Sequence, residues 1–186
     1  MNATSIRKYH LMTLLLLFSG SVVLGQSPEH IANQYLVRNL STLNLTQTDI
    51  ANYRISDKVI KIVYSRPQLK GRSLTNLAKF GKKWRTGANE ATEITFYKDV
   101  NFGGTPVKSG TYTMYTIPGE VNWTVVLSNQ LNVWGVYFHK DENDVAKVTI
   151  PVKKSEEIID VFSIVIDKDM TIHMGWGDLI LSIPVK

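Results

Sequence analysis

From Lys58 to the end of the chain, apolar and polar residues alternate in short runs, which is the pattern of half-buried β-strands. Ile60, Ile62 and Tyr64 share one face of the first run, and turn-forming residues recur at intervals of about 8–12 residues. Eight later segments fit the same pattern: 93–99, 111–117, 123–128, 134–138, 144–152, 157–167, 170–176 and 179–185. No interval between them has room for a crossover helix. We therefore predict an all-β fold, an antiparallel β-sandwich or partly closed barrel of about nine strands, with one N-terminal helix.

Three segments carry further expectations. Residues 158–166 are apolar on both faces, which indicates a central strand covered on two sides. Residues 71–83 break the alternation, so we expect a surface loop or a single helical turn there. Trp123, Trp134 and Trp176 fall in strand periodicity, and we expect them to pack in the core or across strands rather than to form a platform for sugar rings.

The first residues have the features of an export signal. Arg7 and Lys8 precede an uncharged, largely apolar run over residues 11–24, which is followed by a cleavage-compatible sequence before Gln26. The run is shorter than the roughly 20 residues that span a bilayer. We predict a signal peptide, a secreted or periplasmic protein, and no stable membrane insertion after cleavage; an uncleaved anchor is the alternative. The chain has no cysteine, which excludes disulfides, a thiol nucleophile and a lipid anchor on an N-terminal cysteine.

A helix is predicted directly after the leader. Ser27 and Pro28 suit the N-cap and the first helical position, and an apolar stripe runs from residue 32 to residue 43. The segment IANQYLVRNLSTLNLTQTDIANYRISD, which includes this stripe, resembles the beginning of the propeptide domain of secreted metalloproteases. The chain is accordingly divided into a signal peptide (1–25), an N-terminal helix with a linker (26–57) and a β-sandwich domain (58–186).

The formal net charge of +5 is unevenly distributed along the chain. Ten Lys or Arg residues and one acidic residue lie between Arg54 and Arg85, whereas eight Lys and thirteen acidic residues lie between Thr86 and the end. Two parts of one fold that neutralise each other would explain this asymmetry, and a site for a polyanion is the alternative. No nucleic-acid-binding motif is present, and we expect no nucleic-acid partner.

The segment GKKWRTGANEAT does not fit the strand pattern and is expected to form a compact loop before a regular strand. Together with YSRPQLKGR, GGTPVKSGTYTMYTIPGEVNWTVVL, WGVYF and DVAKVTIPV, it resembles the bacterial secreted domain of unknown function 2911 family. The resemblance covers about residues 58–186. It implies export and no known cofactor, and it assigns no reaction because the family's activity is not established. Lys147 stands where we expect an arginine after Asp-Val-Ala.

The loop offers side chains suited to holding a ligand. Arg85 presents a planar fork of donors, Asn89 an amide, and Trp84 a stacking face. Arginines from the preceding basic stretch would complete a pocket for a carboxylate, phosphate or sulfate group. The candidate ligand-binding residues are Arg66, Arg72, Trp84, Arg85, Asn89 and Glu90. The structural alternative is that Arg85 pairs with Glu90, Asn89 caps a turn and Trp84 plugs the end of the sandwich.

From these residues we predict a non-enzymatic binding or structural module whose partner is a small anionic or carbohydrate ligand. The rival hypothesis is a hydrolase acting on an envelope or extracellular glycan or ester, with Glu90 as general acid or base. Glu93 is the nearest second carboxylate, and its spacing from Glu90 predicts opposite faces. A third hypothesis makes the basic stretch a contact surface for anionic lipid or polysaccharide.

Other catalytic and metal-binding patterns are missing from the sequence. It has no G-x-S-x-G elbow, P-loop or dinucleotide fingerprint. His30, His139 and His173 share no ligand spacing. Residues 141–145 predict a turn rather than a calcium loop, because Val145 stands where a third oxygen ligand should be; low-affinity calcium binding is the alternative. We therefore expect neither a metal nor a cofactor.

Overall fold

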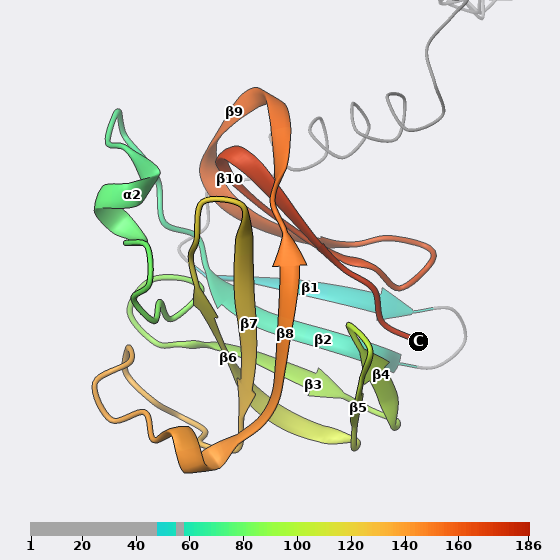
Figure 1. Ribbon diagram of the computed structural model, residues 1–186. Coiled ribbons are helices and arrows are strands. Elements are labelled where there is room, and N and C mark those ends of the chain that lie inside the picture. Colours follow the sequence, from blue (N-terminus) through green and yellow to red (C-terminus); the bar gives the residue numbers. More distant parts are fainter. Residues whose placement is uncertain (1–47, 55–57) are drawn as a thin grey trace, which may run out of the picture.

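The computed structural model describes residues 48–54 and 58–186 (Figure 1). The elements in these ranges are β1 (Thr48–Arg54), β2 (Lys58–Ser65), α2 (Leu74–Leu77), β3 (Thr92–Phe96), β4 (Val100–Phe102), β5 (Thr105–Val107), β6 (Gly110–Ile117), β7 (Asn122–Ser128), the 3-10 helix η1 (Asp141–Asn143), β8 (Asp144–Pro151), β9 (Lys153–Ile166) and β10 (Ile172–Ile183). The predicted signal peptide and N-terminal helix lie outside the described residues. Neither helix in the described ranges has the length and hydrophobicity of a membrane span.

The strands form one large antiparallel sheet and two smaller pairs. The large sheet has the order β1-β2-β3-β6-β7-β8, while β9 pairs with β10 and β4 pairs with β5. The antiparallel all-β prediction is confirmed. The large sheet ends at β1 and β8 within the described residues, so it is not a closed barrel. β1 lies before residue 58, where we expected the β-domain to begin, and it pairs with β2 along its length.

The described residues form ten strands where we predicted about nine for the chain, and the differences have local causes. The two segments predicted at 170–176 and 179–185 are largely one strand, β10, because the pairing with β9 shifts register around Gly177 instead of breaking. Gly177 has φ +64, which lets the backbone make this bulge. The glycine turn at residues 103–104 closes the short β4–β5 hairpin, which the sequence pattern did not predict.

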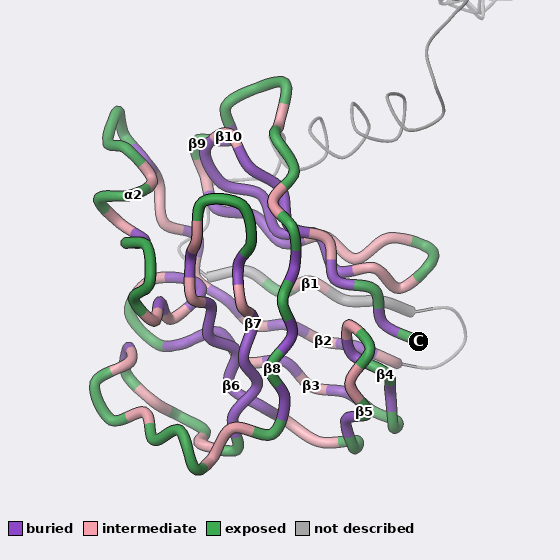
Figure 2. Tube along the Cα trace, viewed as in Figure 1, coloured by how far each residue is buried: buried purple, intermediate pink, exposed green. Residues whose placement is uncertain are grey.

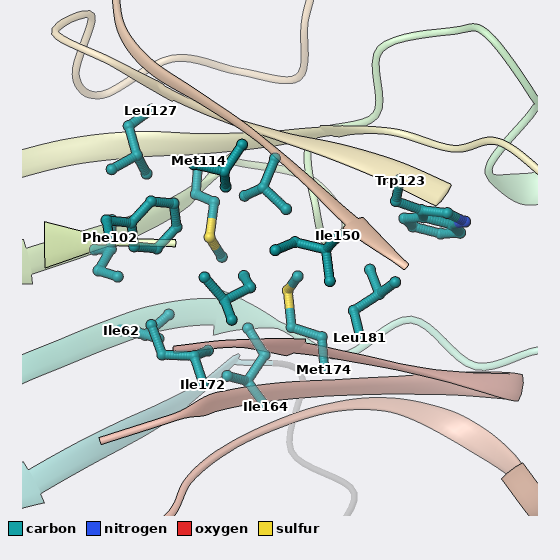
Figure 3. Packing of buried hydrophobic residues seen from close by; sticks show 14 of the residues in the cluster. Ile62, Phe102, Met114, Trp123, Leu127, Ile150, Ile164, Ile172, Met174 and Leu181 are labelled. Carbon is teal, nitrogen blue, oxygen red and sulfur yellow. The ribbon is translucent and has the colours of Figure 1, made fainter. Parts of the chain in front are cut away.

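The core lies between the large sheet and the β9–β10 ribbon (Figure 3). Side chains from the sheet, such as Ile62, Met114 and Leu127, meet Ile164 and Met174 from the ribbon, and all five are at most 2% exposed. Strand alternation produces this arrangement: every second residue of β3 and β8 is buried. Figure 2 shows the same contrast between the buried central strands and the exposed α2 segment and hairpin tips.

Two expectations about apolar segments are wrong. β9 was expected to be a central strand, but it pairs only with β10 among the described strands, and Ile158 is 66% exposed. Residues 134–138 form a turn rather than a strand, because Gly135 takes φ +68 and interrupts the alternation. Trp134 is consequently 56% exposed, whereas Trp123 and Trp176 are buried as expected. The helical turn expected in residues 71–83 is α2.

A second, smaller core lies apart from the main one. Tyr115 on β6, Val126 on β7 and Ala91 form this cluster, and Val133 and Val136 from the segment between β7 and η1 pack against it. We call residues 129–143 the covering loop. The packing of Val133 and Val136 brings the covering loop beside residues 89–91, where Ala91 N donates to Val133 O at 3.1 Å.

Candidate functional site

A cavity of about 550 Å³ lies between the segment that follows β2 and the segment that precedes β3. Four cationic residues line it: Arg66, Lys70, Arg72 and Arg85. Trp84, Trp176 and Asn89 also contribute to the wall. Within the described part of the chain, the lining residues include no Asp, Glu or His. The cavity therefore has a cationic wall without a lining carboxylate.

The segment from Trp84 to Thr92 forms a closed loop at the cavity. At its start, Trp84 N donates to Thr116 O at 2.7 Å and Thr116 N donates to Trp84 O at 2.9 Å. At its end, Thr92 N donates to Arg85 O and the Thr92 hydroxyl donates to Thr86 O at 2.7 Å. These bonds hold the positions of Arg85 and Asn89 between them.

Two residues of this loop have a left-handed backbone conformation. Thr86 has φ +55 and Asn89 has φ +60. This conformation is tolerated by asparagine but strained for a β-branched residue such as threonine. Thr86 is fully buried, and the hydrogen bond from Thr92 holds it in place. Strain of this kind is concentrated at binding and catalytic sites in proteins, so the loop has a feature typical of such sites.

Gly87 packs closely against the end of β2. A Cβ at this position would lie 3.2 Å from Ser65 O and 3.3 Å from the Thr92 hydroxyl oxygen. A larger residue would push the loop away from the end of β2. The glycine therefore brings the Arg85 side of the cavity close to the Arg66 side.

Arg66 is the most firmly held of the cavity arginines. Its residue is 5% exposed, its Nε donates to Phe162 O at 3.3 Å, and its Nη2 donates to Ser163 Oγ at 2.9 Å. Both acceptors belong to β9. Arg66 thus connects the end of β2 to the ribbon and also lines the cavity.

The other two arginines donate to backbone carbonyls of their own loops. Arg72 donates through Nε to Leu69 O at 2.9 Å and through Nη2 to Gln68 O at 2.8 Å. Arg85 donates through Nη1 to Asn89 O at 3.0 Å, and its guanidinium lies 6.0 Å from the ring centre of Tyr137. Within the described residues, no carboxylate forms an ion pair with Arg72 or Arg85. Each retains N–H donors beyond those used.

Trp84 is mainly a packing residue. Its ring is stacked on Trp176 at 5.1 Å between centroids and makes edge contacts with Trp123 and Phe162. The residue is only 9% exposed. An edge of this aromatic cluster therefore reaches the cavity, and the open stacking face that we expected for Trp84 is covered by Trp176.

Glu90 does not join the other candidates. It is exposed, it is not among the lining residues of the cavity, and its backbone bridges to Trp134 in the covering loop. The expected alternative pairing of Arg85 with Glu90 is not formed either, because Arg85 donates to the backbone of Asn89. Of the six predicted residues, the structure brings five to one cavity.

Two features were missed in the sequence. Lys70 lines the cavity, although we had not included it among the candidates. The structure also brings His139 together with Asp141 and Asp144 in a cluster away from the cavity. The order H-x-D-x-x-D over residues 139–144 was the available signal.

Comparison with known proteins identifies a family but no characterised relative. The family model described as "Protein of unknown function (DUF2911)" matches residues 46–185, which includes β1 and every element after it. No curated protein matches the chain, and no solved structure matches it.

Proposed function

The chain belongs to this family of unknown function, so we propose its function from the chemistry of the cavity. We propose that the protein is an exported β-sandwich module that binds a small molecule carrying a carboxylate, phosphate or sulfate group and catalyses no reaction. The observation that carries this proposal is the wall of four cationic residues without an acidic residue among the described lining. Such a wall attracts anions, because Arg72 and Arg85 donate to backbone carbonyls rather than to a carboxylate of the described residues. The volume lies in the range of about 300–1,000 Å³ that is usual for small-molecule sites.

The hydrogen bonds of the arginines support binding of a defined anion. Arg72 and Arg85 are held by backbone carbonyls, so an incoming anion does not have to displace a carboxylate from either of them. A guanidinium group offers parallel donors that match the oxygens of a carboxylate or phosphate. Because these side chains are already oriented, less conformational entropy is lost on binding.

A non-catalytic role fits the lining better than hydrolysis. The described residues of the wall include no Asp, Glu or His that could act as a general acid or base. Glu90, on which the hydrolase hypothesis depended, is exposed and outside the wall. We therefore propose binding alone.

Titration with an anionic probe tests this function. Glucose 6-phosphate and inorganic phosphate are added to the purified chain at constant ionic strength, and binding is followed by tryptophan fluorescence and calorimetry; glucose is the uncharged control. Loss of one charge-assisted contact weakens binding by about 1.5–3 kcal/mol, or roughly ten- to a hundredfold. Arg72→Ala and Arg85→Ala should each show that loss with little change in melting temperature.

Lys98→Ala is the matched control, because it removes one positive charge at an exposed position that does not line the cavity. It should leave the affinity within twofold of the original chain. If neither phosphate probe binds at millimolar concentration, or if all three variants lose affinity equally, the proposal is wrong. N-terminal sequencing of the mature chain tests the proposed export by showing whether cleavage occurs before Gln26.

A further inference from the structure

The covering loop ends in a cluster of three side chains with metal-ligand chemistry. His139 lies just before η1, Asp141 lies in η1, and Asp144 begins β8. His139 Nε2 lies 3.2 Å from Asp141 Oδ1 and 3.0 Å from Asp144 Oδ1. One ligand atom from each of the three residues lies within 4.8 Å of the other two. The cluster therefore presents one nitrogen and two oxygens to a common point.

The two inner members of the cluster are buried, and their polar atoms make close charged contacts without well-directed hydrogen bonds. The side chains of His139 and Asp144 are 2% and 4% exposed. Within the described residues, neither ring nitrogen of His139 and neither carboxylate oxygen of Asp144 takes part in a well-directed hydrogen bond. Buried polar groups in folded proteins are almost always satisfied, so these atoms call for a further partner.

Hydrogen bonding by His139 alone does not explain the geometry. A neutral imidazole has a single N–H, which can serve only one of the two carboxylates near Nε2. A neutral ring leaves a nitrogen lone pair available for coordination.

We propose that His139, Asp141 and Asp144 bind a divalent transition-metal ion of the Zn²⁺ class. With metal–ligand distances of about 2.0–2.1 Å, neighbouring ligand atoms are about 2.9 Å apart at octahedral angles and about 3.4 Å apart at tetrahedral angles. The two distances from Nε2 fall in this interval. The imidazole ligand favours Zn²⁺, Co²⁺ or Ni²⁺ over Mg²⁺ and Ca²⁺, which take oxygen ligands. Three protein ligands leave further coordination positions for solvent.

Two lysines compensate the carboxylates when no metal is bound. Lys83 Nζ lies 2.7 Å from Asp141 Oδ1, and Lys147 Nζ lies 2.9 Å from Asp144 Oδ2. Lys147 is about half exposed and has a long, flexible side chain, so it can move to solvent when a cation enters. Removal of Lys147 should therefore strengthen metal binding. A network of ion pairs without a metal site predicts no such gain.

Calorimetry with Zn²⁺ tests the proposal on the full chain, prepared without a polyhistidine tag and treated with a chelator. The original chain should bind Zn²⁺ more tightly than Mg²⁺ or Ca²⁺. His139→Gln and Asp144→Asn should each weaken Zn²⁺ binding at least tenfold, and Lys147→Gln should strengthen it threefold or more. Zn²⁺ should also raise the melting temperature of the original chain and not that of His139→Gln.

Matched controls separate this site from other acidic and imidazole groups. Glu142→Gln removes an exposed carboxylate from the same turn, and His173→Gln removes a histidine from β10; both should leave Zn²⁺ affinity within twofold. Asp141 is 77% exposed, so Asp141→Asn tests the ligand set even if Asp144→Asn fails to fold. Equal affinity in the original chain and the ligand variants, or no Zn²⁺ binding up to 1 mM, would overturn the proposal.

Discussion

Removal of the Arg66 side chain should destabilise the fold, in contrast to removal of the other cavity arginines. Arg66→Ala deletes the donors to Phe162 O and Ser163 Oγ, and both acceptors lie in a buried part of β9. A hydrogen bond from a charged donor contributes about 1.5–3 kcal/mol, and the longer 3.3 Å bond belongs at the low end of that range. We expect a loss of about 3 kcal/mol in the free energy of unfolding.

Urea denaturation followed by tryptophan fluorescence measures this loss. For a chain of this size, about 3 kcal/mol corresponds to a fall in melting temperature of roughly 6–12 °C. Arg72→Ala should change the free energy of unfolding by no more than about 0.5 kcal/mol, because Arg72 is exposed and donates only within its own loop. Such a difference would assign Arg66 to positioning the cavity wall and Arg72 to contact with the ligand.

A double-mutant cycle with Ser163→Ala isolates the contact between the two side chains. The coupling energy between Arg66 and Ser163 should be about 1 kcal/mol or more. If Arg66→Ala unfolds at the same urea concentration as the original chain, or if the coupling is zero, the side chain does not connect β2 to β9 as argued.

Two further predictions concern local parts of the fold. Burial disfavours ionised Asp167, but hydrogen bonds from His173 and backbone N–H groups outweigh it and lower the Asp167 pKa. The stability that ionised Asp167 contributes is present above its unfolded-state pKa of about 4 and is lost as the pH falls through the lower folded-state pKa. Urea denaturation from about pH 5 down to 2 should therefore show a steeper loss of stability for the original chain than for Asp167→Asn. Gly103→Ala should lower the free energy of unfolding by more than about 1–2 kcal/mol, because Gly103 has φ +56 and a Cβ would approach Val148 to 3.1 Å. Gly71→Ala is the control, because Gly71 has φ +76 but no neighbour within 4 Å of a Cβ, so its thermal melting measures the cost of backbone strain alone.

The strand pattern was readable from the sequence wherever one face is buried. Ile60, Ile62 and Tyr64 are all at most 2% exposed, as their alternation predicts. The prediction of a central strand at residues 158–166 was wrong, because the pattern of apolar residues does not specify how many strands pair with a segment. Residues 158–166 are apolar on both faces, but β9 pairs only with β10 among the described strands and Ile158 is exposed. Periodicity specifies which faces are apolar, and the number of neighbouring strands depends on contacts distant in sequence.

Five of the six candidate residues reach one cavity because the loop with unusual composition has unusual backbone geometry. The glycine and asparagine of RTGAN allow a close approach and a left-handed turn, both visible as residue types in the sequence. The position of Glu90 was not predictable in this way, since it depends on the pairing of its backbone with Trp134 in the covering loop. His139 was missed for the same reason: its partners are close in sequence, but its burial depends on Tyr115, whose ring lies 4.6 Å away on β6.

The uneven charge of the chain supports both explanations offered for it, in different places. Lys83 from the basic stretch pairs with Asp141 from the acidic part, so some of the charge is neutralised within the fold. Arg72 and Arg85 have no such carboxylate partner in the described residues, although Arg85 lies only two positions after Lys83. A general surface for polyanions would use the exposed lysines of this stretch as well, and binding would then decline steeply with salt. A built cavity instead requires specific guanidinium groups. Loss of binding in Arg85→Ala but not in Lys82→Ala, an exposed lysine of the stretch outside the cavity lining, distinguishes the two.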